Sequence, residues 1–134
     1  MLFSKNAVTS FKSLTLTLSG MRCIDEYEII CNGKESDVAY YTRFYTKNED
    51  ERSLNKRATH PTEAIIKLFN ECRLLSWNGF CGRNPIGVRD GYMFVLKAEV
   101  NDGLMIRAEG SNNYPKHYRT LTNAISDMLN CASE

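Results

Sequence analysis

The chain has 134 residues and a formal net charge of +1, from 17 Lys and Arg against 16 Asp and Glu. Its length fits one domain over residues 1–134, and its 43% hydrophobic and 25% charged residues are ordinary for a globular protein. These values argue against a disordered tail, a collagen-like rod and a membrane span. The near-neutral charge also makes duplex nucleic acid an unexpected partner.

Strand-like alternation dominates the first half of the chain. Leu14, Leu16 and Leu18 alternate with polar residues, a period of two that buries one face of a strand. Asn32-Gly33 is a strong two-residue turn signal between the second strand and the third. The predicted strands span residues 14–19, 23–31, 37–46 and 52–59, with a polar loop at 47–51.

The second half is predicted to hold two helices around a hairpin. The first helix is expected to begin at His60-Pro61, because proline is tolerated in the first helical turn, and to end near residues 75–77. Its inward residues are expected to be Ile65, Leu68, Phe69, Cys72 and Leu75. The hairpin pairs residues 92–100 with 104–109 about the turn Asn101-Asp102-Gly103. Pro115 opens the last helix, whose expected inward residues are Tyr118, Leu121, Ile125, Met128 and Leu129.

This element order, ββββαββα, predicts an α+β fold. Strands that are segregated from two amphipathic helices form a two-layer sandwich, with an antiparallel sheet of about six strands and both helices on one face.

The cysteines and the N-terminus indicate a reducing compartment. An odd count, with no closely spaced pair, argues against a disulfide framework; the cysteines are Cys23, Cys31, Cys72, Cys81 and Cys131. Residues 1–6 lack the apolar run of a secretory signal, so we expect a cytoplasmic protein. The two histidines, His60 and His117, stand apart from any cysteine pair, so we expect no metal site and no cofactor.

Residues 77–91 are the most unusual segment, because they hold four of the eight glycines. The chain resembles a family of small bacterial α+β proteins in the order of three motifs. These motifs are Trp77-Asn78-Gly79-Phe80, Asp90-Gly91 before a strand, and Ser111-Asn112-Asn113-Tyr114-Pro115. The resemblance covers about residues 65–120. That family has no assigned activity, so the resemblance implies the architecture and transfers no catalytic residue.

Two surfaces are candidates for contact with a partner protein. The third predicted strand carries Tyr41, Arg43 and Tyr45 on one face, and tyrosine and arginine are enriched at protein interfaces. The glycine-rich segment adds Phe80, Arg83 and Arg89.

A small-ligand site between the two loops is the alternative. Glycine-containing loops at 77–91 and 111–115 flank one hairpin and can converge at one end of the sheet. The residues that would hold an anionic ligand are Trp77, Arg89, Asp90, Ser111 and Asn112. For each of them a structural interpretation stays open: Trp77 can cap the core, Asn112 or Asn113 can cap the last helix, and the arginines can be solvated.

Catalytic arrangements have less support. Cys81 with His60 or His117, and Asp90 with Glu109, lack an identifiable third group that would orient them. No catalytic residue is therefore assigned, and we expect a binding protein more readily than an enzyme.

These observations favour a small stand-alone protein-binding module. Immunity proteins, antitoxins and phage-encoded inhibitors are similar to it in size and in their lack of catalytic motifs. This comparison is an analogy and does not rest on a shared sequence motif. The alternatives are a small-ligand (anion) binding protein or enzyme and, more distantly, a protein that stacks single-stranded nucleic acid on its strand tyrosines. The oligomeric state and the identity of the partner stay open.

Overall fold

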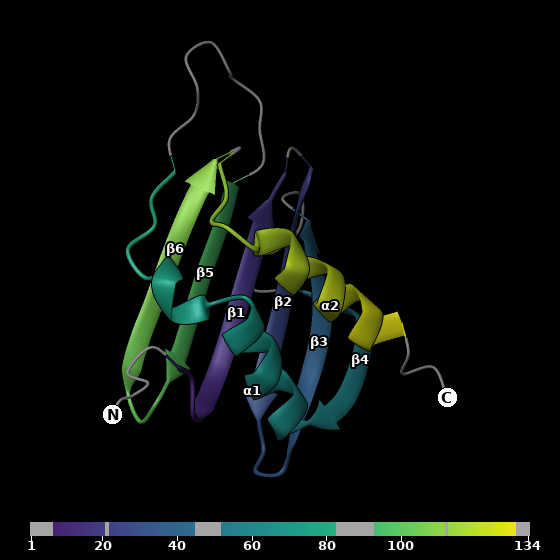
Figure 1. Ribbon diagram of the computed structural model, residues 1–134. Coiled ribbons are helices and arrows are strands. Elements are labelled where there is room, and N and C mark those ends of the chain that lie inside the picture. The colour runs from purple at the N-terminus through teal and green to yellow at the C-terminus, as the bar shows by residue number, and fades with distance from the viewer. Residues whose placement is uncertain (1–6, 21, 45–51, 83–92, 112, 131–134) are drawn as a thin grey trace.

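An antiparallel sheet organises the computed structural model, which describes residues 7–20, 22–44, 52–82, 93–111 and 113–130. Within these ranges the sheet has six strands in the order β4-β3-β2-β1-β5-β6 (Figure 1). The strands are β1 (Phe11–Ser19), β2 (Cys23–Cys31), β3 (Glu35–Phe44), β4 (Ser53–Pro61), β5 (Met93–Val100) and β6 (Leu104–Ser111). Every neighbouring pair is antiparallel, so the predicted α+β architecture is confirmed.

Both helices cover the same face of the sheet. Helix α1 (Thr62–Glu71) follows β4, a short 3-10 helix η1 (Leu74–Trp77) follows α1, and α2 (Tyr118–Asn130) follows β6 (Figure 1). None of the helices that the structure describes is both long and apolar enough to cross a membrane.

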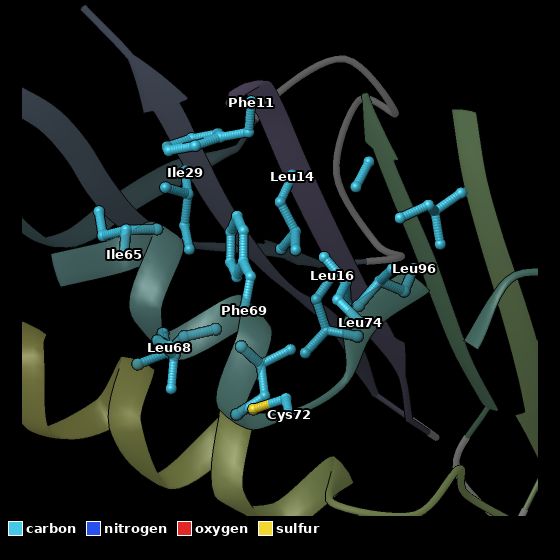
Figure 2. Packing of buried hydrophobic residues seen from close by; sticks show 14 of the residues in the cluster. Phe11, Leu14, Leu16, Ile29, Ile65, Leu68, Phe69, Cys72, Leu74 and Leu96 are labelled. Atoms are coloured by element: carbon cyan, nitrogen blue, oxygen red, sulfur yellow. The ribbon is translucent and has the colours of Figure 1, made fainter. Parts of the chain in front are cut away.

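The core fills the space between these helices and the sheet. Figure 2 shows Phe69 of α1 pointing from its helix toward Phe11, Leu14 and Ile29 of the strands. The rings of Phe11 and Phe69 meet edge to face, with their centroids 5.1 Å apart. Alternate residues are buried on β1, as in Leu14 and Leu16, and on β5, as in Phe94, Leu96 and Ala98, whereas β2 and β4 each bury one residue, Ile29 and Ala58.

The boundary between β4 and α1 lies later than the sequence suggests. Pro61 has extended backbone, with φ −60° and ψ 136°, and it pairs with Glu35 as the last residue of β4. Helix α1 therefore begins at Thr62, whose backbone N–H donates to the carbonyl oxygen of Lys34. The Thr62 hydroxyl also donates to the Gly33 carbonyl and lies 2.7 Å from the hydroxyl of Ser36, which is fully buried.

The first helix also ends earlier than predicted. Arg73 adopts a left-handed backbone conformation, with φ 56°, and this breaks the α-helix after Glu71. The 3-10 turn that follows rotates the chain, so Leu74 is buried in the core while Leu75, which was predicted to face inward, is half-buried.

The last helix starts at Tyr118, three residues after Pro115. The carbonyl oxygen of His117 accepts hydrogen bonds from the backbone N–H groups of Thr120 and Leu121, so the chain enters the helix at His117. Asn113 therefore lies too far ahead of α2 to cap it, and Asn112 is outside the described residues.

Candidate interaction surface

We call the face of the sheet opposite the helices the helix-free face. No helix among the described residues lies against it (Figure 1). Its central strand, β1, contributes a row of small hydroxyl residues, which are Ser13, Thr15, Thr17 and Ser19. All five ion pairs that the structure describes are made by side chains of this face, at the β2–β4 end and on β6. The face therefore combines paired charges with exposed apolar side chains, which are Ile30, Leu54, Met93 and Met105.

A compact group of side chains at the β2–β4 end surrounds Tyr41. The Arg52 guanidinium lies over the Tyr41 ring, with its central carbon 3.7 Å from the ring centroid. The register places Tyr41 opposite Leu54 of β4, and Arg43 opposite Ile24 of β2. We call these five residues, Ile24, Tyr41, Arg43, Arg52 and Leu54, the Tyr41 patch.

Two carboxylates beneath the patch hold its arginines in place. Glu26 pairs with Arg43 at 3.2 Å and with Arg52 at 2.9 Å, and Arg52 also reaches Glu28 at 3.6 Å. The Glu26 side chain is only 13% exposed, whereas those of Arg43 and Arg52 are 34% and 32% exposed. The outer layer of the patch is thus guanidinium, tyrosine ring and aliphatic side chain, with the compensating negative charge underneath.

A separate ion pair lies near the outer edge of β4. Arg57 pairs with Asp37 of β3 at 3.0 Å, and the Thr59 hydroxyl and the Asn32 amide also donate to the Asp37 carboxylate. The hydrogen bond from Arg57 is the main cause that holds the pKa of Asp37 below its ordinary value. Asp37 is therefore ionised in the neutral range and carries several donors.

Trp77, one of the residues predicted to line the loop site, is packed in the core. Trp77 is 1% exposed, and its indole N–H donates to the carbonyl oxygen of Lys116 at 3.1 Å. Its ring packs against Tyr118, for which burial raises the pKa of the phenol. Phe80 is half-buried near Phe94, a core residue, so Phe80 faces the helix side of the sheet. Trp77 thus acts as a core residue, which was the structural interpretation left open for it.

Of the residues predicted to bind a partner, the three that the structure describes, Tyr41, Arg43 and Phe80, lie on two different surfaces. Tyr41 and Arg43 lie on the helix-free face of β3, while Phe80 lies beyond β6 and packs on the opposite side. Of the predicted ligand residues, Ser111 is the last residue of β6 and is half-buried. Three predicted partner-binding residues, Tyr45, Arg83 and Arg89, and two further predicted ligand residues, Asp90 and Asn112, lie outside the described residues.

Residues 78–82, which we call the edge segment, pair with the outer edge of β6. Three backbone hydrogen bonds join them: from Gly79 N–H to Arg107 O at 2.9 Å, from Glu109 N–H to Phe80 O at 3.0 Å, and from Gly82 N–H to Glu109 O at 2.9 Å. The Asn78 side-chain oxygen accepts from the Arg107 N–H at 3.0 Å. Both backbone groups of Arg107 and of Glu109 on this edge are therefore satisfied.

Of the candidate catalytic pairs, Cys81 and His60 lie at opposite edges of the sheet, and Asp90 lies outside the described residues. His60 lies on β4 and bonds the Met128 carbonyl oxygen through its ring, while Cys81 lies beside β6 at the other edge of the sheet. Glu109 is paired with Arg107 at 2.9 Å. Burial raises the pKa of the Cys72 thiol to about 11, which leaves it protonated and unreactive.

A depression of about 560 Å³ lies elsewhere, at the C-terminal end of α1. Its lining includes Asn70, Arg73 and Ser76 and none of the predicted site residues. The Asn70 amide is already used, because it exchanges two hydrogen bonds with the backbone of Val8. Arg73 and Ser76 alone do not form a charged pocket.

Comparison of the chain with protein-family models, curated proteins and solved structures gave no match. The resemblance drawn from residues 77–115 therefore stays a prediction.

The sequence did not reveal the role of three residues of this surface or the pairing of the edge segment with β6. Glu26, Glu28 and Arg52 were treated as ordinary strand or loop residues, although they hold the Tyr41 patch together. The available signal was alternation itself, which places Glu26 and Glu28 on the same face of β2. The pairing of the edge segment with β6 had no comparable signal. Residues 78–82 show no alternation of apolar and polar residues, so the sequence does not indicate which strand they pair with.

Proposed function

We propose that this chain is a protein-binding module, of the inhibitor or immunity type, that contacts its partner through the Tyr41 patch. The observation that carries the proposal is the Tyr41 ring held under the Arg52 guanidinium, with both arginines anchored by Glu26. Tyrosine and arginine are the residue types that most often dominate binding energy at protein interfaces.

The rigidity of the patch supports this proposal. Ordering a long side chain on binding costs about 0.5–1.5 kcal/mol, and this cost is lower for a side chain that is already held. Tyr41 and Arg43 stand on β3, which is paired on both sides by β2 and β4, and Arg52 is fixed by two carboxylates. The patch therefore presents its contact groups in one arrangement.

The apolar neighbours also support it. Leu54 is 52% exposed on β4 beside Tyr41, and Ile24 is half-exposed opposite Arg43. An aromatic ring with adjacent aliphatic side chains and charged groups around it has the composition of an interface centre with a polar rim.

The small-ligand alternative has less support from the described residues. It required Trp77 to line a pocket between two loops, and the Trp77 side chain is packed in the core instead. No second function is therefore proposed.

The test is affinity capture of the tagged chain from a lysate of its native host, followed by mass spectrometry. Three baits are compared: the unmodified chain, Tyr41→Ser, and Lys97→Gln as the control. Lys97 lies on β5 on the same face, outside the Tyr41 patch. We expect a stoichiometric protein with the unmodified chain and with Lys97→Gln, and its loss with Tyr41→Ser. Recovery of the bait alone, or of the same proteins with all three baits, contradicts the proposal.

A further inference from the structure

We propose that the outer edge of β4 is a docking site for an extended acidic segment of the partner protein, which adds a strand beside Lys56–His60. This inference rests on the proposed protein-binding function and names the chemistry of the partner. In this arrangement backbone hydrogen bonds supply affinity, and side chains of alternate residues supply selectivity.

The first support is that β4 is an unpaired edge. β4 is the terminal strand of the sheet beyond β3, and no described residue hydrogen-bonds to its outer backbone groups. Eight of its nine residues are exposed or half-buried, with Ala58 the buried exception. A strand of this length with free N–H and C=O groups is a template for another strand.

The second support is the geometry of β4, which limits the docking site to one stretch. The pairing shifts between Tyr40, which faces Lys56, and Tyr41, which faces Leu54, so that Asn55 is an extra residue in the strand. Such a bulge bends the strand and interrupts its ladder. The regular stretch therefore runs from Lys56 to His60, before Pro61, which has no N–H to donate.

The third support is the charge of β4, which favours an acidic strand over a second copy of this chain at the edge. Residues 52–62 contain Arg52, Lys56 and Arg57 and no acidic residue. The Arg57 side chain is 60% exposed, while its partner Asp37 is 27% exposed, so the cation is the more accessible member of the pair. Two copies of this edge would bring like charges together, which opposes self-pairing. An acidic strand would instead form cross-strand ion pairs along the same edge.

The edge is also continuous with the Tyr41 patch. Leu54 belongs to β4, and Arg52 directly precedes it. A partner that covers the patch therefore lies next to the Lys56–His60 edge, and one extended segment can reach it without a second interface.

The experiment is an NMR titration of the isotope-labelled full chain with a synthetic peptide of about ten residues in which Glu and Thr alternate. A peptide in which Lys replaces each Glu is the charge control. The variants Arg57→Glu and Arg107→Glu are matched, because each breaks one exposed ion pair of the helix-free face. The two pairs have similar lengths, 3.0 and 2.9 Å, and similar arginine exposure, 60% and 56%.

We expect the acidic peptide to shift and protect the amides of Lys56–His60 and the basic peptide to leave them unchanged. Arg57→Glu should weaken binding at least about fivefold, since attraction becomes repulsion, while Arg107→Glu should change it less than about twofold. The inference is overturned if the acidic peptide does not bind, if it protects amides elsewhere than on β4, or if the basic peptide binds equally well. It is also overturned if the two variants have equal effects or if the free chain self-associates through these amides.

Failure of this inference can be told apart from failure of the proposed function. Arg57→Glu is added to the affinity capture as a fourth bait. If Tyr41→Ser loses the captured protein and Arg57→Glu keeps it, the binding function stands and the β4 edge is not its docking site. If the unmodified chain captures no protein, the function itself fails, whatever the peptide does.

Discussion

The backbone groups at the two edges of the sheet, β6 and β4, differ in whether they are hydrogen-bonded by other described residues. At β6 the backbone groups of Arg107 and Glu109 are satisfied by residues 78–82, through three backbone hydrogen bonds and the Asn78 side chain. At β4 no described residue pairs with the outer backbone, and the strand instead carries cations, a bulge and a terminal proline. An edge strand whose backbone groups are already hydrogen-bonded cannot pair with another strand. An edge strand that carries charges keeps its backbone groups accessible, and the charges favour a partner strand of opposite charge. The comparison indicates that β4 is the edge available for a partner.

The covered edge also explains two glycines of the second half. A Cβ atom added at Gly82 would lie 2.6 Å from the Asn113 Cβ, and one added at Gly110 would lie 2.5 Å from the Asn113 carbonyl oxygen. The edge segment, the end of β6 and the chain before α2 therefore approach one another as closely as backbones can.

The largest effect should come from removing the side chain that anchors the edge segment. Trp77→Ala should lower the free energy of unfolding by about 3–5 kcal/mol, because a fully buried indole is lost. Since residues 78–82 follow Trp77 directly, exchange of the Glu109 amide should accelerate before global unfolding. Urea denaturation and hydrogen exchange measure both effects. Leu54→Ala on β4 is the control, since Leu54 is 52% exposed; equal losses in the two variants would contradict the role of Trp77.

A smaller loss should follow from crowding the close approach at β6. Gly110→Ala places a methyl group 2.5 Å from the Asn113 carbonyl oxygen and 2.9 Å from a Phe94 ring carbon. Overpacking of this kind costs about 1–3 kcal/mol, which urea denaturation can resolve. Ser111→Ala, at the next position of the same strand, should stay within about 0.5 kcal/mol of the unmodified chain. A Gly110→Ala protein as stable as the Ser111→Ala control would show that the chain near Asn113 moves aside freely.

The faces of the strands could be predicted from the sequence, but their pairing could not. A turn centred on Asn32-Gly33 would place Glu26 opposite Ala39; the observed hydrogen bond from Asn32 N–H to Glu35 O centres the turn one residue later, so Glu26 faces Tyr41. A shift of the turn by one residue moves the pairing by two positions and leaves every side chain on its face. Alternation therefore located Tyr41 and Arg43 correctly on one face without revealing that Glu26 lies next to them.

The C-terminal end of α1 could not be predicted either, because hydrophobic periodicity identifies the buried face of a helix and not the residue at which the helix ends. Ile65, Leu68, Phe69 and Cys72 follow the helical period, and all four are buried as expected. The period says nothing about Arg73, whose left-handed conformation ends the helix although arginine has no preference for it. Local propensity therefore does not locate the residue at which the helix ends.

A modest effect should follow from loss of the Asn78 side chain. Asn78→Ala removes the acceptor for the Arg107 N–H, which should cost about 0.5–1.5 kcal/mol and speed exchange of that amide. Asn55→Ala on β4 is the matched control, because the Asn55 amide donates only to the Thr42 hydroxyl and no backbone group depends on it. Hydrogen exchange followed by NMR compares the two variants. If the Arg107 amide exchanges equally fast in both, Asn78 contributes nothing to the cover over β6.

The smallest effect concerns the charge pair at the open edge. Arg57 is the main cause of the lowered pKa of Asp37, so Arg57→Gln should raise that pKa toward its ordinary value of 3.8. Because the folded-state pKa is below the unfolded one, the stabilisation is present above about pH 4 and is lost as the pH falls through the folded-state pKa. The change in stability should be under about 1 kcal/mol, since the Arg57 side chain is 60% exposed and the pair is screened by solvent. Titration of the Asp37 carboxyl carbon by NMR measures the shift, and Arg107→Gln should leave it in place. If both variants moved the pKa of Asp37 equally, the effect would come from net charge, and the edge of β4 would not have the local electrostatics that an acidic strand requires.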